Sequence, residues 1–403
     1  MTPEQQLEHL VGDASEVHTH EELLAKLRLG RPLRIKYGAD PSAPDLHLGH
    51  AVPMTRLRRF QDLGHQVIFI IGDFTGRIGD PSGRSKTRPM LSTEQIEHNA
   101  ATFAAQAGKI LDIDACEIRY NSEWLDPLGT DGLVKLASRY TVARMLERDD
   151  FAKRMASETP ISIVEFLYPL VQAYDSVAIE ADVEAGGTDQ LFNFLVARDI
   201  MRSYDLEPQV AACWTLLVGT DGVEKMSKSL GNYVGISEAP EQMFGKLMSI
   251  ADEILPHYYA LLTDEGFEGA AEIDRRMQAG DLHPMDAKKR LARIIIERYH
   301  DAEAAARAQE EFEAVFSRGE LPSEMPEHCV AAGDLEDGRA WIVALVAGSG
   351  GASSNSEARR LIRGGGVKLN DERIDDESAN VPVHTGDVLQ VGKRHFAKLV
   401  VED

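Results

Sequence analysis

The stretch from residue 33 to residue 64 constrains the fold of this chain most, because it reads as a strand, a loop and a helix in direct succession. Residues 33–37 predict a short strand, and a helix is predicted from about Leu48 to a glycine stop at Gly64. The first backbone N–H groups of a helix are unpaired, and the helix dipole favours negative charge there. The stretch therefore predicts an anion site at the start of this helix.

The alternation of strand and helix continues beyond this unit. Residues 67–71 form an uninterrupted apolar run, which indicates a parallel strand buried on both faces. A long helix is predicted from about Ser92 to Leu111, and a further strand over 116–120. Repeated β–α–β units predict an α/β fold with a doubly wound, Rossmann-like parallel sheet, whose ligands bind beyond the carboxyl ends of the strands.

Two short motifs lie in loops at that end of the predicted sheet. His47 and His50 stand at the start of the first helix with Gly49 between them, and residues 224–229 read Glu-Lys-Met-Ser-Lys-Ser after a strand predicted over 209–218. Two histidines alone are more often a capping pair or a chance spacing, and the lysine loop alone could be a solvated surface loop. Both motifs in this order and at this separation are a specific signal.

These motifs resemble the HIGH and KMSKS signatures of the class I aminoacyl-tRNA synthetases. Residues 47–50 match the first with one conservative change, and residues 225–229 match the second letter for letter. Within that family the chain is most similar, over nearly its whole length, to the tyrosyl-tRNA synthetases of the bacterial branch. The resemblance implies ATP-dependent activation of L-tyrosine to tyrosyl-adenylate with release of pyrophosphate. Transfer of tyrosine to the 3′-terminal adenosine of tRNA(Tyr) would follow.

The resemblance also implies the site residues and the cofactors. The catalytic residues would be His47, His50, Lys225 and Lys228, with Mg²⁺ held by the ATP phosphates and no metal site of the protein's own. ATP would be bound by residues of the loops and motifs, namely Asp40, Ser42, His47, Gly49, His50, Gly187, Asp189, Lys225, Met226, Ser227, Lys228 and Ser229. Tyrosine would be bound by Lys36, Asp80, Tyr168, Gln172, Asp175 and Gln190.

Three of the tyrosine-binding candidates share one face of a predicted helix. Tyr168, Gln172 and Asp175 are spaced i, i+4 and i+7 over residues 161–177, among apolar neighbours. An exposed face is the plain alternative, but Tyr and Gln among so many apolar residues more often serve a buried polar ligand. At Lys36 the chain departs from its family, where many members have a tyrosine that contacts the substrate phenol. Tyr37 is one residue along and is expected to face the opposite side of the strand, so phenol recognition would depend on Asp175 alone.

The chain divides into three predicted domains. Residues 1–236 would form the catalytic domain, residues 237–335 a helical anticodon-binding domain that ends in a Pro/Glu linker at 319–336, and residues 336–403 a small α+β domain. The last segment resembles the RNA-binding domain of ribosomal protein S-four, with Arg359, Arg360, Arg363 and Lys368 as RNA-binding candidates. A net charge of −23 argues against non-specific nucleic-acid binding, so RNA contact would depend on local basic patches and no DNA partner is expected.

The remaining features concern compartment, assembly and rival functions. The chain has no apolar run of membrane-spanning length, a polar N-terminus and three widely separated cysteines, so we expect a cytoplasmic protein with no membrane partner. The resemblance implies a homodimer, with apolar residues over 133–146 as a candidate interface. The rivals are a tryptophanyl-tRNA synthetase, a nucleotidyltransferase with a histidine–glycine–histidine signature, and a synthetase-like RNA-binding or regulatory protein without catalysis.

Overall fold

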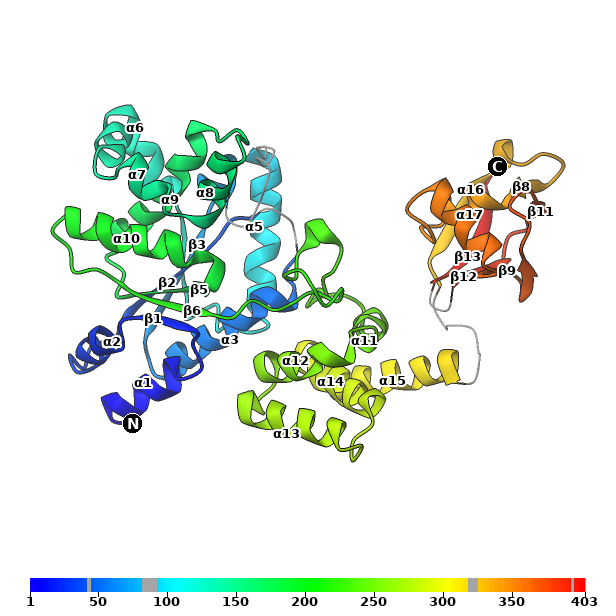
Figure 1. The fold of residues 1–403 in the computed structure, drawn as a ribbon, viewed down its shortest axis with the longest axis horizontal. Coiled ribbons are helices and arrows are strands. Elements are labelled where there is room, and N and C mark those ends of the chain that lie inside the picture. The colour runs from blue at the N-terminus through cyan, green and yellow to red at the C-terminus, as the bar shows by residue number, and fades with distance from the viewer. Residues whose placement is uncertain (42–44, 82–92, 318–324, 393–394, 403) are drawn as a thin grey trace. The chain divides into compact units, whose positions relative to one another are not determined.

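The computed structural model describes residues 1–41, 45–81, 93–317, 325–392 and 395–402 of the 403-residue chain (Figure 1). Contacts divide the chain into two compact units, Met1–Ala305 and Ala306–Asp403. Within the described residues, no helix is both long enough and apolar enough to cross a membrane. The predicted ATP-binding residue Ser42 lies outside the described residues.

The first unit contains a six-stranded sheet. Its strands are β1 (Glu16–His18), β2 (Arg34–Ala39), β3 (Gln66–Ile71), β4 (Glu117–Tyr120), β5 (Val183–Gly187) and β6 (Val210–Trp214). The order across the sheet is β1-β6-β5-β2-β3-β4, and every pairing is parallel except that of β1 with β6. The prediction of a doubly wound parallel sheet is confirmed. The three-residue edge strand β1 was not predicted.

Helices cover both faces of this sheet. Their bounds are α1 (Pro3–Val11), α2 (His20–Leu27), α3 (Leu48–Asp62), α4 (Thr75–Ile78), α5 (Thr93–Ala107), α6 (Ser122–Ala137), α7 (Val142–Met145), α8 (Asp149–Ala156), α9 (Ile163–Ala178) and α10 (Leu191–Ser203). Figure 1 shows α9 and α10 on one side of the sheet and α3 and α5 on the other. The apolar residues of β3 are at most 1% exposed, which explains their continuous run, because a strand covered on both faces has no solvent side for polar residues. The helical insertion predicted over 131–155 begins earlier, at Ser122.

The order of the strands places a crevice next to β2. From β2 the chain proceeds to β3 and β4 on one side, and β5 and β6 lie on the other side. The strand order therefore reverses at β2 and β5, and in such sheets the loops that leave the neighbouring strands diverge and open a ligand crevice at the carboxyl ends. The loops after β2, β3 and β5 leave the sheet at this edge.

A helical group follows in the chain. It consists of α11 (Pro240–Met248), α12 (Leu255–Leu262), α13 (Gly266–Gln278), α14 (Pro284–Tyr299) and α15 (Ala302–Ser317). The wholly helical pattern predicted from residue 238 onward agrees with this group. Buried Arg56 on α3 joins it to the sheet region, because its Nη1 donates a hydrogen bond of 2.8 Å to the Leu261 carbonyl at the end of α12.

The second unit is a small α+β structure. A five-stranded sheet has the order β10 (Glu372–Ile374), β9 (Val367–Leu369), β12 (Val388–Val391), β13 (His395–Glu402) and β7 (Glu327–Ala331). Helices α16 (Ile342–Gly348) and α17 (Asn355–Arg363) accompany it, with a second small sheet of β8 (Arg339–Trp341) and β11 (Asn380–Pro382). Strand β7 pairs in parallel with β13, so the linker predicted over 319–336 is wrong for these five residues. The three-domain division stays a prediction.

Candidate active site

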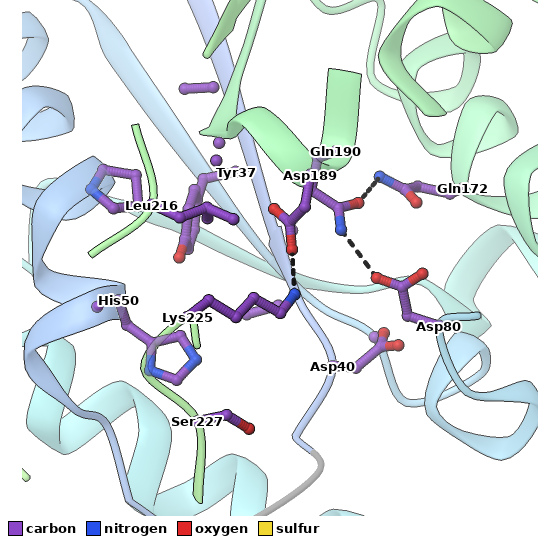
Figure 2. Close-up of a pocket in the computed structure, with 18 of the residues that line it drawn as sticks. Tyr37, Asp40, His50, Asp80, Gln172, Asp189, Gln190, Leu216, Lys225 and Ser227 are labelled. Carbon is purple, nitrogen blue, oxygen red and sulfur yellow. Dashed lines mark hydrogen bonds and ion pairs between the residues drawn. The ribbon is translucent and has the colours of Figure 1, made fainter. Parts of the chain in front are cut away.

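A cavity of about 640 Å³ opens at the carboxyl ends of β2, β3, β5 and β6 (Figure 2). It lies at the reversal of strand order, which is where ligands bind in doubly wound sheets. Most of the site residues predicted from the sequence line it, namely Asp40, His47, Gly49, His50, Asp80, Tyr168, Gln172, Asp175, Gly187, Asp189, Gln190, Lys225, Met226, Ser227, Lys228 and Ser229.

Both histidines lie at the N-terminus of α3 with fixed tautomers. His47 caps the helix, and its Nδ1 accepts a hydrogen bond of 3.2 Å from the backbone N–H of Gly49. The Nδ1 of His50 accepts one of 3.3 Å from the backbone N–H of His47. Since each Nδ1 is an acceptor, each neutral ring carries its proton on Nε2. The pair therefore offers two N–H donors.

The histidines are uncharged at neutral pH. Burial lowers the pKa of His47 far below its usual range, and the neighbouring His50, Lys228 and Lys225 side chains lower it further. Burial, with Lys228 and Lys225 nearby, lowers the pKa of His50 to about 4. The positive charge at this end of the cavity therefore comes from the lysines and the helix dipole.

The loop that carries the two lysines lies against the start of α3. Buried Met226 anchors it, and its backbone N–H donates 2.8 Å to the Leu217 carbonyl. A Cβ atom at Gly49 would lie 3.5 Å from the Met226 Cβ and 3.0 Å from the His47 ring, so glycine allows this close approach. Met226 thus lies between the segment after β6 and the first turn of α3.

Each lysine of the loop has an acidic partner. The Lys225 ammonium lies 2.7 Å from an Asp189 carboxylate oxygen, and Figure 2 shows its side chain reaching across the cavity past His50. Lys228 donates to the Asp45 backbone carbonyl and lies 3.9 Å from the Asp45 carboxylate. Burial lowers the pKa of Lys228, and the Asp45 charge opposes that shift. Asp45 was not predicted.

One side of the cavity is rich in oxygen atoms. The Tyr168 hydroxyl donates 2.9 Å to Asp40, and the Gln190 amide donates 2.8 Å to Asp80. Gln172 approaches Gln190 at 3.4 Å, as Figure 2 shows, and among the described residues its buried Oε1 has no hydrogen-bond partner. Two carboxylates and an available amide oxygen are suited to an ammonium group.

A buried carboxylate lies further into the cavity. Asp175 on α9 is 3% exposed, and it accepts hydrogen bonds from Trp124 Nε1 at 2.8 Å and Asn121 Nδ2 at 3.4 Å. Burial raises the pKa of Asp175 to about 7, and the Lys36 charge and both hydrogen bonds oppose this rise. A buried carboxylate in this part of the cavity can accept a hydrogen bond from a hydroxyl group of a ligand.

Comparisons with known proteins agree with this arrangement. A family model described as tRNA synthetases class I (W and Y) matches residues 28–317, and an S4 domain model matches residues 341–389. The tyrosine–tRNA ligase of Oleidesulfovibrio alaskensis is 53% identical over 402 residues and covers 100% of both chains. That of Aquifex aeolicus is 51% identical over 400 residues and covers 99% of this chain and 100% of its own.

The chain belongs to the tyrosine–tRNA ligase family. The prediction of this family is confirmed, and the tryptophanyl alternative finds no support among these relatives. A crystal structure of the tyrosyl-tRNA synthetase of Archaeoglobus fulgidus in complex with L-tyrosine shares the fold, with a TM-score of 0.62 at 23% identity, and covers 75% of this chain and 99% of its own.

Lys36 was predicted from the resemblance to bind tyrosine, and this role stays a prediction. Lys36 is 1% exposed and does not line the cavity, because its ammonium pairs with Glu184 at 2.7 Å beneath α9. Tyr37, which was expected to face away from the ligand, does line the cavity and packs on Phe69 with ring centres 5.5 Å apart. The alternation of the strand holds, but the cavity extends over the face that carries Tyr37.

Sequence reasoning also missed two residues that hold Asp175. Asn121 follows β4 directly, and Trp124 lies in the first turn of α6. Their position after a strand at the carboxyl edge of the sheet was a usable signal, because loops at this edge form the ligand site. Nothing in their spacing indicated Asp175 as their partner.

The basic candidates of the S4 domain lie on and near α17. Arg359 stacks over Trp341, with its Cζ 5.4 Å from the ring centre, and Arg360 is exposed and 3.4 Å from Glu357. Arg363 pairs with Glu377, and Lys368 on β9 lies 3.7 Å from Asp371. Arg360, Arg363 and Lys368 thus each lie beside an acidic side chain.

Proposed function

We propose that the cavity forms tyrosyl-adenylate from L-tyrosine and ATP, and that the chain then transfers tyrosine to tRNA(Tyr). The observation that carries this proposal is that one cavity contains both a buried carboxylate and the two motifs suited to phosphates. Buried Asp175 lies at one end, and His47, His50 and the lysine loop lie at the other. A phenol-bearing amino acid and a triphosphate could thus meet between them.

L-Tyrosine would bind through both of its polar ends. Its phenol O–H would donate to the Asp175 carboxylate, while Asn121 and Trp124 hold that carboxylate in place. Its ammonium group would lie among the oxygens of Asp80, Gln172 and Tyr168, which leaves the substrate carboxylate directed toward the histidines. Binding at two ends orients the attacking carboxylate, and orientation is a large part of the rate enhancement in such reactions.

ATP would occupy the side of the cavity next to β5 and β6. The Asp189 carboxylate is suited to the ribose hydroxyls, and a Cβ atom at Gly187 would lie 2.9 Å from the Asp189 Oδ1 and 2.6 Å from Leu216, so glycine keeps this side open. Lys225 forms an ion pair with Asp189 in this structure. Ribose binding to Asp189 would break this pair and leave the Lys225 ammonium available to the phosphates.

Activation requires charge stabilisation more than covalent chemistry by the protein. A tyrosine carboxylate oxygen attacks the α-phosphorus in line, the bond from that phosphorus to the α,β-bridging oxygen breaks, and pyrophosphate leaves with the bonding electrons. The Nε2–H groups of the histidines would donate to phosphate oxygens, and the lysine loop would place positive charge beside the leaving pyrophosphate. In the second step a ribose hydroxyl of the tRNA attacks the tyrosyl carbonyl carbon, and AMP leaves.

Mg²⁺ would accompany the ATP phosphates. Within the described residues, no group of three or more His, Cys, Asp and Glu side chains could hold a metal ion. The ion would be bound by phosphate and water oxygens, and it would neutralise charge on the triphosphate.

Exchange of labelled pyrophosphate into ATP, without tRNA, tests the activation step. Tyrosine should support exchange, and phenylalanine and tryptophan should not. Exchange with tryptophan would overturn the assignment of the Asp175 end of the cavity. If none of the three amino acids supports exchange, the proposed activation chemistry is wrong.

Tyrosine use should depend on pH through Asp175. The ordinary value of 3.8 is raised to about 7, so this carboxyl is protonated below that pH in the free protein and ionised above it. We therefore expect kcat/KM for tyrosine to increase as the pH rises from about 6 to 8. The pKa values of His47 and His50 lie below this window. Steady-state exchange rates at subsaturating tyrosine would show the rise, and a flat profile would contradict it.

The S4 domain is proposed to bind tRNA through its basic patch. Replacing Arg360 with alanine should weaken tRNA binding and reduce the slope of log affinity against log salt by about one, because one phosphate contact is lost. Tyrosine-dependent exchange without tRNA should not change. The matched control is Arg58→Ala, which removes an exposed arginine from an Asp62 pair on α3. Equal losses of affinity in the two variants would count against a specific patch.

We also propose a cytoplasmic homodimer. Cys116, Cys213 and Cys329 are free thiols, which fits a reducing compartment. Exposed apolar residues on and near the insertion helices, including Val134, Val142 and Met155, are candidates for the interface. Analytical ultracentrifugation would test the dimer, and aspartate at Val134 and Val142 should shift it toward monomer.

A further inference from the structure

Lys36 is a buried cation just outside the cavity, and the activation chemistry above does not use it. It is 1% exposed, and its ammonium forms three short contacts, with Glu184 at 2.7 Å, the Gln172 carbonyl at 2.8 Å and the Ser176 hydroxyl at 2.9 Å. An ammonium has three N–H donors, so this set uses all of them. The ammonium therefore has no N–H left for a ligand, and it can act on the reaction only through neighbouring residues and its charge.

Two of those three contacts are to one turn of α9. The Gln172 carbonyl and the Ser176 side chain bracket Asp175 on the helix, so Lys36 holds the turn that presents this carboxylate. Glu184 completes the network from β5, where its carboxylate accepts a hydrogen bond from Gln209 at 2.6 Å and from Ser176 at 3.1 Å. The whole network is buried.

We propose that Lys36 is a positioning residue for tyrosine, which holds the Asp175 turn and uses its charge to keep that carboxylate ionised for the phenol O–H. This proposal rests on the proposed function of the cavity. It assigns a task to the position at which the chain departs from the family pattern. Lys36 would replace a direct phenol contact with an indirect one through Asp175.

The charges that face Asp175 act in opposite directions. Lys36 from β2 favours the ionised carboxylate, and Glu184 from β5 disfavours it. Trp124 and Asn121 from the start of α6 donate hydrogen bonds to it, which also favours ionisation. Burial opposes all three favourable contacts and is the largest influence. The two members of the Lys36–Glu184 pair therefore have opposite effects on Asp175, although they stabilise each other.

Because the two residues have opposite effects on Asp175, variants of each can show whether Lys36 acts through its charge or only through packing. Either Lys36→Met or Glu184→Gln breaks the same ion pair, so a merely structural pair predicts effects of the same kind in both variants. The charge role predicts opposite ones. The midpoint of kcat/KM for tyrosine against pH should move up in Lys36→Met by about one unit, because a nearby opposite charge lowers a carboxyl pKa by about this amount and its removal raises it again. It should move down in Glu184→Gln.

The experiment is tyrosine-dependent pyrophosphate exchange between pH 5.5 and 8.5 in the wild-type chain and both variants, with circular dichroism as a check of folding. The Lys36→Met variant should lose about ten-fold in kcat/KM for tyrosine at the acid end of this range and about five-fold near pH 7, and the loss should shrink toward pH 8.5 as Asp175 ionises. A packing defect would not recover with pH. The KM for ATP should stay the same.

Several outcomes would overturn the proposal. They are midpoints that move in the same direction in the two variants, midpoints that do not move, or a loss in Lys36→Met that is constant with pH. If Lys36→Met does not fold, Glu184→Gln alone tests the proposal, because the proposal requires a lower pH midpoint of kcat/KM for tyrosine in that variant. An absence of exchange in the wild-type chain would instead refute the proposed function, so the two failures can be told apart.

Discussion

Replacing Lys228 with alanine is expected to slow tyrosyl-adenylate formation by about 10²–10³-fold, which is typical when one preorganised donor to developing charge is removed. The half-buried Lys228 lies at the histidine end of the cavity, where pyrophosphate would leave. Its charge matters most as the phosphorus–oxygen bond breaks, so the effect should be on the rate constant. The KM for tyrosine should stay nearly unchanged, because the tyrosine subsite is formed by other residues. Single-turnover measurements of adenylate formation would check this.

Lys246→Ala is the matched control for the Lys228 variant. Lys246 also carries one positive charge, pairs with Glu238 at 2.6 Å and lies over Tyr233, but it does not line the cavity. Its loss should change the adenylation rate little. A Lys228→Ala variant that behaves like this control, or that raises the KM for tyrosine without slowing the chemical step, would remove Lys228 from its proposed role.

Replacing Asp175 with asparagine should reduce the preference for tyrosine over phenylalanine by about 10- to 100-fold, because a hydrogen bond to a charged group contributes about 1.5–3 kcal/mol. Asparagine keeps the shape of the side chain and removes the charge. The KM for tyrosine should rise, while use of phenylalanine should not fall, because phenylalanine has no hydroxyl to lose. The ratio of kcat/KM values for the two amino acids, measured by pyrophosphate exchange, reports this change.

Tyr168→Phe separates this effect from general damage to the tyrosine subsite. The Tyr168 hydroxyl donates to Asp40 on the side proposed for the ammonium group, which tyrosine and phenylalanine share. Its loss should reduce the use of both amino acids by similar factors and leave their ratio unchanged. An unchanged ratio in Asp175→Asn as well would mean that another group recognises the phenol.

Much of the sheet and of the site could be predicted from the sequence. The apolar run of β3 predicted a strand covered on both faces, and the glycine stop at Gly64 lies just beyond α3. The two motifs predicted a shared site because loops at the carboxyl ends of parallel strands meet at one edge. Each of these signals depends on residues close together in the chain, where side-chain periodicity and backbone preference determine the local structure. The proposed roles of the site residues stay predictions.

The sequence by itself determined the alternation of the main strands and helices around the site, the family and the side chains that reach the cavity from α9. Only the tertiary structure decided that Lys36 lies beneath the cavity, that Asn121 and Trp124 hold Asp175, and that β7 completes the sheet of the second unit. These contacts join residues far apart in the chain. Their formation depends on how buried surfaces pack and on which charged groups pair in the low-dielectric interior. Local sequence patterns do not specify these long-range contacts.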